Sequence, residues 1–271
     1  MEKEFQVGFI GAGKMATALA QGLLKAQVLT TEEMIASDPD ARAREAFTKA
    51  VGVRVVPDNA EVIQRAQIII LAVKPSLVVP VLESTKSKFS PDQLVISIAA
   101  GVKLAQIESA LGDRQRIIRV MPNTAVFVGA GVSAYSPNTA ALLQDIALVE
   151  KYFSAVGMVI RVPEPLMDVV TGLSGSGPAY VCTFIEALAD GAVAMGMAKD
   201  VALKLAAHTV LGSAKWVIES GAHPAVLRDT VTSPGGTTIA GIRALEEGAF
   251  RGTVINAVMA ATQRAKELSG A

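Results

Sequence analysis

The sequence predicts an α/β fold, in which a doubly wound, mostly parallel sheet is followed by an all-helical second half. Short β-branched runs such as 68–73 alternate with amphipathic stretches up to about residue 162. Runs without polar alternation are typical of strands that helices cover on both faces. After residues 163–165 the strand pattern stops, and segments rich in Ala, Gly and Met follow. We therefore predict two domains, 1–163 and 164–271.

The individual elements follow from local composition, in chain order. Strands are predicted at 5–10, 34–37, 53–56, 68–73, 94–98, 116–120, 131–135 and 158–162. Helices are predicted at 13–26, 40–50 and 138–156, with a short helical piece between the third and fourth strands, and in the second half at about 179–197, 202–220, 239–247 and 253–268. Asp38, Pro39 and Asp40 mark the start of the second helix, because Asp and Pro favour a first turn.

Composition excludes several classes of protein. The chain has 25 basic and 25 acidic residues among 271, so it has no positive field to attract nucleic acid. Its one cysteine, Cys182, precludes an intrachain disulfide and a cysteine zinc cluster, and we expect no metal. The start, Met1 to Glu4, has no signal-peptide pattern, and no apolar run approaches the roughly 20 residues of a membrane helix. We expect a cytoplasmic protein with no membrane partner.

The helical half is rich in small side chains, which cannot easily form a compact core alone. Two interpretations remain open from this composition. One is an ordinary helical subdomain, and the other is a dimer whose long helices pack across a two-fold axis.

The first turn matches G-x-G-x-x-A, follows a predicted strand and opens a predicted helix, as a Rossmann-type dinucleotide site requires. In that mechanism the first glycine permits the tight turn, the second lets a pyrophosphate approach the backbone, and the alanine lets helix and strand pack closely. The phosphates then lie at the positive end of the helix. The residues are Gly11, Ala12, Gly13, Lys14, Met15 and Ala16.

The end of the second strand predicts the adenosine ribose contact. Asp38 stands where an acidic residue normally binds the 2′-hydroxyl of NAD. Ser37, with Arg42 and Arg44 nearby, could instead hold a 2′-phosphate. These residues leave the choice between NADH and NADPH open. Whether the two arginines bind a phosphate or only lie on a solvated helix face also stays open.

Two Gly-rich segments of the second half are candidates for the reaction site. Leu173 to Tyr180 is predicted to be a flexible approach to a long helix. In the second segment, hydroxyls and backbone N–H groups before a helix could hold a carboxylate, or could form a plain turn with a Thr cap. Its candidate residues are Ser233, Gly235, Gly236, Thr237 and Thr238.

The sequence offers no obvious general acid for carbonyl reduction. His208 lies inside a predicted helix and His223 precedes Pro224, so both are predicted to be structural or surface residues. The lysine that β-hydroxyacid dehydrogenases carry about four residues after a Gly-x-Gly is absent after Gly175–Gly177. An imine, which can arrive already protonated, fits better, and Thr238 could be the hydrogen-bond partner of its nitrogen.

These segments closely resemble the pyrroline-5-carboxylate reductase family. The matching segments are 8–16, 71–75, 97–102, 119–124, 171–180 and 231–239, in this order along nearly the whole chain. The resemblance implies reduction of L-1-pyrroline-5-carboxylate to L-proline, the last step of proline biosynthesis, by NADPH, with NADH left open. It also implies a homodimer in which the loop of one subunit completes a shared active site. A larger ring of dimers stays open.

The resemblance also implies roles for single residues. Residues 11–16 take the pyrophosphate, and Ser37, Asp38 and Asn59 lie on the adenosine side. A further set is expected along the nicotinamide ribose, the ring and the cleft: Ala72, Val73, Lys74, Pro75, Ala99, Ala100 and Asn123. Residues 233–238 and, as a weaker candidate, Glu164 are expected to bind the substrate, with Thr238 catalytic.

Asp38 is a departure from the family pattern, because many members carry a small hydroxyl or basic residue there, and its carboxylate would repel a 2′-phosphate. Two other functions are alternatives at this point. One is a related imine or hydroxyacid oxidoreductase, against which the absent lysine argues. The other is a dinucleotide sensor without chemistry, against which the intact 233–238 loop argues.

Overall fold

A computed structural model describes residues 3–270 of the chain. Met1, Glu2 and Ala271 lie outside the described residues. The prediction that Met1 to Glu4 is no signal peptide falls partly on them, as do the outer ends of both predicted domains. The chain divides into two compact units. Unit 1 comprises Met1–Gly175 and Ala261–Ala271, and unit 2 comprises Ser176–Ala260.

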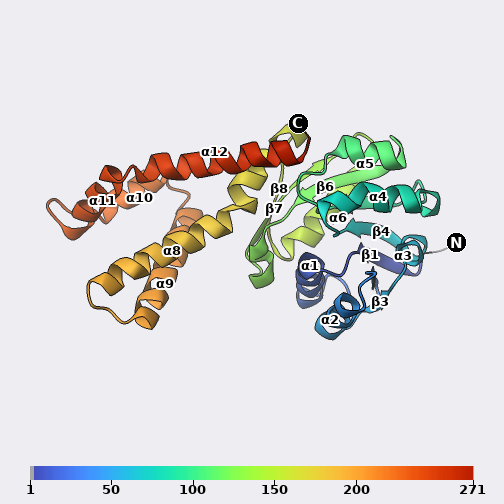
Figure 1. Cartoon of the computed structure of the whole chain (residues 1–271), viewed down its shortest axis with the longest axis horizontal. Coiled ribbons are helices and arrows are strands. Elements are labelled where there is room, and N and C mark those ends of the chain that lie inside the picture. The colour runs from blue at the N-terminus through green and yellow to red at the C-terminus, as the bar shows by residue number, and fades with distance from the viewer. Residues whose placement is uncertain (1–2, 271) are drawn as a thin grey trace. The chain divides into compact units, whose positions relative to one another are not determined.

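Unit 1 is built on an eight-stranded sheet of order β3-β2-β1-β4-β5-β6-β7-β8 (Figure 1). The first six strands are parallel to one another, β7 is antiparallel to β6, and β8 is parallel to β7. The predicted doubly wound, mostly parallel sheet is thereby confirmed. The strands are β1 (Phe5–Ile10), β2 (Met34–Ser37), β3 (Arg54–Val56), β4 (Ala66–Leu71), β5 (Leu94–Ser97), β6 (Arg116–Met121), β7 (Gly131–Pro137) and β8 (Gly157–Arg161).

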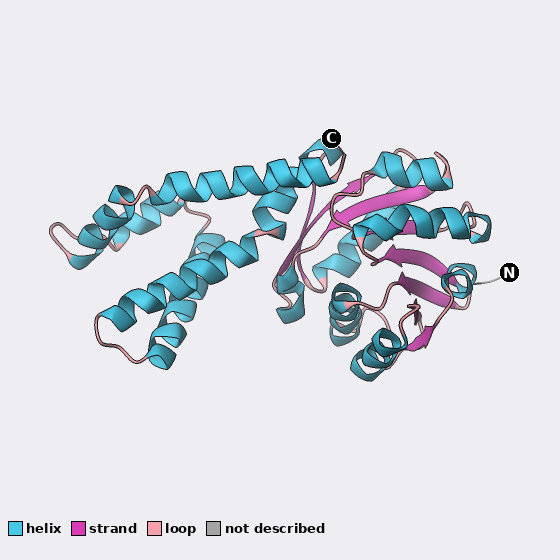
Figure 2. Ribbon diagram, viewed as in Figure 1, coloured by secondary structure: helices cyan, strands magenta, loops and turns pink. Residues whose placement is uncertain are grey.

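Helices cover both faces of this sheet (Figure 2). Alternate residues of one strand enter different cores, since Ile68 and Ile70 pack on one face while Ile69 and Leu71 pack on the other. The first core includes side chains of α1 (Lys14–Lys25), α2 (Ala41–Val51) and α6 (Leu143–Ser154), and the second includes side chains of α3 (Asn59–Arg65), α4 (Pro75–Thr85) and α5 (Leu104–Leu111). Both faces are apolar, as the runs without polar alternation predicted.

The remaining helical elements of unit 1 are short. They are the 3-10 helices η1 (Lys86–Lys88), η2 (Thr124–Val128) and η3 (Glu164–Leu166), the helix α7 (Met167–Val170) and the π-helical turn η4 (Thr171–Gly175). The helices that belong to unit 2 are α8 (Gly177–Ala194), α9 (Lys199–Ser220), α10 (Pro224–Thr230) and α11 (Thr237–Glu247), whereas α12 (Phe250–Leu268) begins in unit 2 and ends in unit 1.

Three local predictions differ from the structure. β4 ends at Leu71 rather than at residue 73, because its neighbour β1 ends at Ile10, whose carbonyl accepts the last hydrogen bond of the ladder from the Ala72 N–H at 2.8 Å. α6 begins at Leu143 rather than at residue 138. Asn138 is held outside the helix because its Oδ1 accepts hydrogen bonds from the N–H groups of Ile117 and Ala141, both at 3.1 Å.

The third difference is that Leu173 to Tyr180, predicted to be a flexible approach to a helix, begins in the π-helical turn η4 and continues into α8, which starts at Gly177. The helices predicted one by one from the sequence also do not include α4, α5 or α10. His223 caps α10, since its Nδ1 accepts a 3.2 Å hydrogen bond from the N–H of Ala225. The expected structural role of His223 is therefore confirmed.

The compact units do not coincide with the segments 1–163 and 164–271. Residues 164–175 and the end of α12 belong to unit 1, because the chain returns there after crossing unit 2. The predicted boundary at residue 163 marks where the chain changes from alternating strands and helices to helices alone. As a division into domains it stays a prediction.

By length and mean hydropathy alone, α9 could cross a membrane. One such helix is weak evidence, and α9 carries Lys204, His208 and Lys215 along its length. It is little buried within the single chain, with 11% of its most apolar stretch covered.

Gly8→Ala should destabilise unit 1, because a Cβ at this position would lie 2.5 Å from Val62 Cγ1 and 2.8 Å from Ala66 Cβ. Overpacking of this kind typically costs about 1–3 kcal/mol, which corresponds to a fall in Tm of roughly 2–10 °C. Gly13→Ala is the control, because its Cβ would meet no atom within 4 Å. Thermal unfolding of the cofactor-free variants measures both, and equal Tm values would contradict the packing described here.

Candidate functional site

The turn after β1 is possible only with glycine at position 11. Gly11 has φ +99°, and a Cβ there would lie 2.8 Å from the carbonyl oxygen of Ala72. Its N–H donates a 2.8 Å hydrogen bond to the carbonyl of Ser37, at the end of β2. The turn is therefore pressed between the carboxyl ends of β2 and β4, where the strand order reverses. Open α/β sheets bind their ligands at this kind of switch point.

The start of α1 leaves room and unsatisfied donors for an anion. Gly13 is its N-cap residue, no side chain caps the helix, and a Cβ on Gly13 would meet no atom within 4 Å. Lys14 is exposed, Met15 is half-buried and Ala16 is fully buried against the first core. Helix N–H groups facing open space fit a pyrophosphate.

Asp38 joins this turn to the end of β2. One carboxylate oxygen, Oδ2, accepts a 3.0 Å hydrogen bond from the N–H of Ala12, and Oδ1 accepts one from the N–H of Asp40 at 2.9 Å. The half-buried carboxylate is therefore held in one orientation beside the glycine turn. An acceptor fixed here suits a ribose hydroxyl.

Ser37 and Asn59 form a buried pair beneath this position. Ser37 is fully buried, and its hydroxyl donates a 2.8 Å hydrogen bond to Oδ1 of Asn59. Since the Ser37 hydroxyl lies inside the protein, its nearest route to a ligand is through the half-buried Asn59 at the start of α3.

The two arginines near Asp38 differ. Arg44 is half-buried, and its Nη1 donates 2.9 Å hydrogen bonds to the carbonyls of both Asp38 and Pro39. Its guanidinium is thereby fixed beside Asp38, and no hydrogen bond among the described residues uses its Nε or Nη2. The Arg42 side chain is exposed.

The segments expected beneath the nicotinamide lie at the ends of adjacent strands. The Ala72 N–H binds the end of β1, and the Ile98 N–H donates a 3.1 Å hydrogen bond to the carbonyl of Leu71. Lys74 is the exposed N-cap of α4, and its carbonyl accepts a 2.9 Å hydrogen bond from the N–H of Leu77. A cavity of about 470 Å³ within unit 1 is lined by Pro75, Ser76, Val79, Ala100, Gly101, Val102, Gln106, Thr171, Ala265 and Leu268. Val73 is half-buried and Ala99 is buried.

Asn123 is buried, and its amide connects three segments of unit 1. Oδ1 accepts hydrogen bonds from the N–H groups of Ala125 and Val132, at 3.2 and 3.1 Å, and Nδ2 donates one to the carbonyl of Ser174 at 3.0 Å. All of these partners are backbone groups. The side chain thus organises the chain around the end of β6 rather than leaving its polar atoms free.

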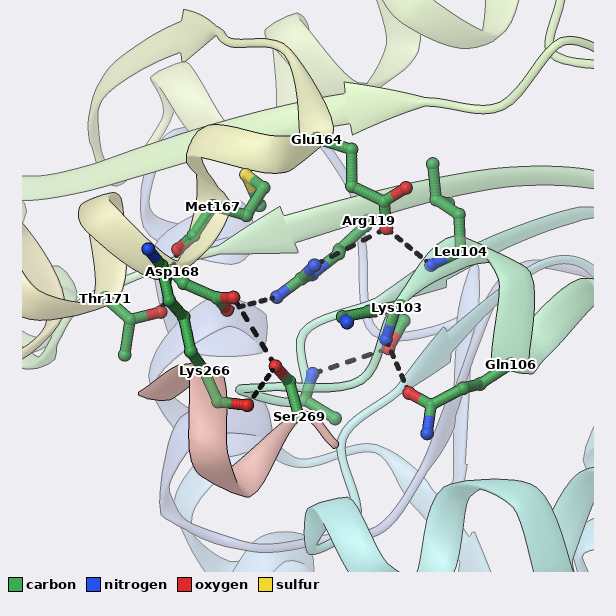
Figure 3. A network of polar contacts seen from close by, with 12 residues as sticks. Lys103, Leu104, Gln106, Arg119, Glu164, Met167, Asp168, Thr171, Lys266 and Ser269 are labelled. Carbon is green, nitrogen blue, oxygen red and sulfur yellow. Dashed lines mark hydrogen bonds and ion pairs between the residues drawn. The ribbon is translucent and has the colours of Figure 1, made fainter. Parts of the chain in front are cut away.

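Glu164 belongs to a polar cluster at the amino end of α5. Its Oε1 accepts a 2.6 Å hydrogen bond from the N–H of Leu104 and a 3.4 Å one from Nη1 of Arg119 (Figure 3). Sequence reasoning did not select Arg119. The available signal was an arginine between Ile118 and Val120, inside a predicted buried strand.

The loop at 233–238 lies in unit 2 and leads into α11, whose amino end is not capped by a side chain. Gly235 has φ +67°, the Gly236 N–H donates a 3.1 Å hydrogen bond to the carbonyl of Ser233, and Gly236 is the N-cap of α11 without a side-chain cap. A Cβ on Gly236 would lie 2.4 Å from Oγ of Ser233. The alternative of a turn closed by a Thr cap is not what forms, since Thr237 and Thr238 are the first two residues of the helix.

Within the described part of the chain, no hydrogen bond occupies the hydroxyls of Ser233, Thr237 or Thr238. Ser233 and Thr237 are exposed, and Thr238 is half-buried. Hydroxyls beside free helix N–H groups can bind a carboxylate.

Tyr135, Tyr152 and His208 are not suited to donate a proton in this site. Burial raises the pKa of Tyr152 to about 12, and burial together with the hydrogen bond to Glu150 raises the pKa of Tyr135 to about 12. His208 Nδ1 lies 2.8 Å from the carbonyl of Lys204 within α9. Among residues 3–270, no group of three or more His, Cys, Asp or Glu is placed to hold a metal ion.

Comparisons with known proteins agree with this geometry. Residues 164–268 match the family model described as pyrroline-5-carboxylate reductase dimerisation, and residues 6–101 match the model described as NADP oxidoreductase coenzyme F420-dependent. The pyrroline-5-carboxylate reductase of Methanosarcina acetivorans is 49% identical over 263 residues, covering 97% of each chain. The chain belongs to the pyrroline-5-carboxylate reductase family.

Solved structures of the family have the same fold as this chain. The Plasmodium falciparum pyrroline carboxylate reductase with NADP bound has a TM-score of 0.89 at 33% identity, covering 99% of this chain and 100% of its own. The Coxiella burnetii pyrroline-5-carboxylate reductase has a TM-score of 0.90 at 37% identity, covering 98% and 99%. The predicted resemblance is confirmed. The dimerisation match begins at residue 164, and it includes the last part of unit 1.

Gly11→Ala should weaken NAD(P)H binding roughly ten-fold or more, because it combines a left-handed φ with a contact to the Ala72 carbonyl. A fluorescence titration of the cofactor measures the Kd. Gly52→Ala is the matched control, since Gly52 also has a positive φ, +80°, but ends α2 away from the turn. An unchanged Kd for Gly11→Ala, or an equal loss in both variants, would contradict the assignment.

Proposed function

We propose that this chain reduces L-1-pyrroline-5-carboxylate to L-proline with NAD(P)H, the last step of proline biosynthesis. The observation that carries the proposal is the uncapped, hydroxyl-lined start of α11, in a chain whose glycine turn fits a dinucleotide. The family membership and the solved relative with NADP bound support it. Consumption of NAD(P)H by the purified protein on addition of pyrroline-5-carboxylate tests it. A dinucleotide sensor would bind the cofactor without turnover.

In the reaction, bound NAD(P)H supplies a hydride to the carbon of the substrate's C=N bond. The residues of this chain orient the reactants. The turn at residues 11–16 holds the pyrophosphate, and the N–H groups and hydroxyls of the 233–238 loop hold the substrate carboxylate. Because a protonated imine needs no strong acid, the Thr238 hydroxyl suffices as the hydrogen-bond partner of the ring nitrogen.

Cofactor choice depends on the charges around Asp38. We infer that NADPH is preferred and NADH accepted, because the fixed guanidinium of Arg44 offsets the repulsion between Asp38 and a 2′-phosphate. The carboxylate of Asp38, held by two backbone N–H groups, remains an acceptor for a 2′-hydroxyl. Both nucleotides can therefore be bound.

We propose a homodimer in which the loop of one subunit completes the site of the other. The dimerisation segment of the family supports association of copies, and so does the surface of unit 2. Its core of fully buried apolar side chains is small, comprising Ala189, Ala202 and Ala206, whereas many large ones are exposed. Exposed apolar surface of this extent marks an interface. The exposed set includes Leu205, Leu211, Trp216, Ile218, Val254, Ile255 and Met259. A ring of such dimers in the cytoplasm is the larger assembly that we propose, and the mass of the particle in solution tests it.

Thr238→Ala should lower kcat by roughly 10- to 1000-fold, because the lost hydrogen bond forms mainly in the transition state. Thr238→Ser should retain most of the rate, since it keeps the hydroxyl. Thr253→Ala, which removes an exposed helix hydroxyl bonded only to the Ala249 carbonyl, is the control. If kcat of Thr238→Ala equals that of the control, Thr238 has no role in the reaction.

Arg44→Gln should lower kcat/KM for NADPH by roughly 10- to 100-fold, the range for losing a hydrogen bond to a charged group. The value for NADH should change less than about two-fold, since it lacks the 2′-phosphate. Arg42→Gln is the control for loss of charge, because Arg42 is exposed on the same helix. Steady-state kinetics of the three proteins with both cofactors measures these values. A much higher kcat/KM of the unaltered protein for NADH than for NADPH would contradict the proposed preference for NADPH.

A further inference from the structure

The chain passes between its two compact units at two points. The first lies between Gly175 and Ser176, where η4 leads into α8, and the second lies inside α12, between Ala260 and Ala261. The proposed substrate loop belongs to the segment between these crossings. Whatever fixes the two crossings in unit 1 therefore also fixes the ends of the segment that carries the loop.

The first anchor is a buried arginine of β6. The Arg119 side chain is 3% exposed, and its Nη2 forms a 3.6 Å ion pair with Oδ1 of Asp168 in α7, while Nη1 reaches Glu164. Figure 3 shows the guanidinium between these two carboxylates. A buried guanidinium left without its partners would be strongly unfavourable. The segment from η3 to α7 is therefore held against β6.

The same carboxylate of Asp168 holds the end of α12. Its Oδ2 accepts a 3.4 Å hydrogen bond from Oγ of Ser269, a residue that is 4% exposed (Figure 3). The Ser269 hydroxyl also lies 2.9 Å from the carbonyl of Lys266, in the last turn of the helix. Asp168 thus bridges β6 and the unit 1 end of α12.

The first crossing is held by contacts of η4, the turn that follows α7 in the chain. η4 follows α7 without a break, and the carbonyl of Ser174 accepts the hydrogen bond from Asn123 described above. Gly175 also lies against β6, because a Cβ there would lie 2.7 Å from Cε of Met121, the last residue of that strand. Both crossings are consequently tied to β6 and its continuation, one through Asn123 and one through Asp168.

We propose that Arg119, Asp168 and Ser269 are positioning residues for the reduction. They hold α7 and the end of α12 as one body, so that the segment carrying the substrate loop leaves unit 1 at fixed points. This inference rests on the proposed function. A cavity of about 450 Å³ lies beside the cluster and is lined by Lys103, Arg119, Glu164, Pro165, Asp168 and Lys266.

Ser269→Ala tests the proposal with a matched control. Ser84→Ala removes a hydroxyl that also bonds a carbonyl three residues earlier at 2.9 Å, but that touches no second element. The expected result for Ser269→Ala is a roughly ten-fold fall in kcat/KM for pyrroline-5-carboxylate, with the Kd for NADPH within about two-fold of the unaltered protein. Ser269→Thr, which keeps the hydroxyl, should restore most of the loss, and Ser84→Ala should show none.

Hydrogen exchange separates this proposal from the proposed function. In Ser269→Ala, and not in Ser84→Ala, the amides of residues 167–180 and 261–269 should exchange faster. If the unaltered protein does not reduce pyrroline-5-carboxylate, the proposed function fails, and this exchange pattern still decides whether the anchor exists. Unchanged exchange, or a loss of kcat/KM matched by an equal loss of NADPH binding, would overturn the positioning role.

Discussion

The close approach of the turn after β1 to the end of β4 is the constraint on which the dinucleotide half depends. β1 pairs on one side with β2 and on the other with β4, so the chain leaving β1 must turn at once between them. Only glycine fits, since position 11 needs a left-handed φ and faces the Ala72 carbonyl. The turn aims the start of α1 at the crevice, and the fully buried Ala16 lets that helix lie close to the strand.

The two compact units reach stability by different means. Unit 1 buries β-branched strands between two layers of helices, which is a complete core in one chain. Unit 2 has long helices whose small residues allow close packing while their large apolar residues face outward. This part of the chain matches the dimerisation model of the family. The helix α9 passes a membrane criterion because it is long and apolar while only 11% of its most apolar stretch is buried within the single chain.

Much of the fold could be predicted from the sequence because its signals are local. Continuous apolar runs located the strands, and the G-x-G-x-x-A turn located the start of α1. The misplacements had non-local causes. β4 ended early because its neighbour β1 ends at Ile10, and α6 began late because Asn138 accepts a hydrogen bond from β6. The flexible approach predicted at 173–180 is helical, a conformation to which the side chain of Asn123 contributes from a distant segment.

The candidate site shows the same division. Motifs selected Asp38, but nothing in the sequence showed that its two oxygens accept different N–H groups, or that Ser37 would point inward to Asn59. Glu164 was selected by resemblance as a substrate residue, whereas the structure gives it backbone and arginine partners within unit 1. Pairings such as Arg119 with Asp168 join residues far apart in the chain, and no local pattern encodes them.

The burial of Ser269 near the carboxyl end of the polypeptide has a practical consequence for handling the protein. A purification tag or fluorescent fusion appended there would begin within a residue or two of an interior hydrogen bond. Trimming the last turn would likewise remove part of a helix that ties together pieces of the chain separated by a whole helical unit.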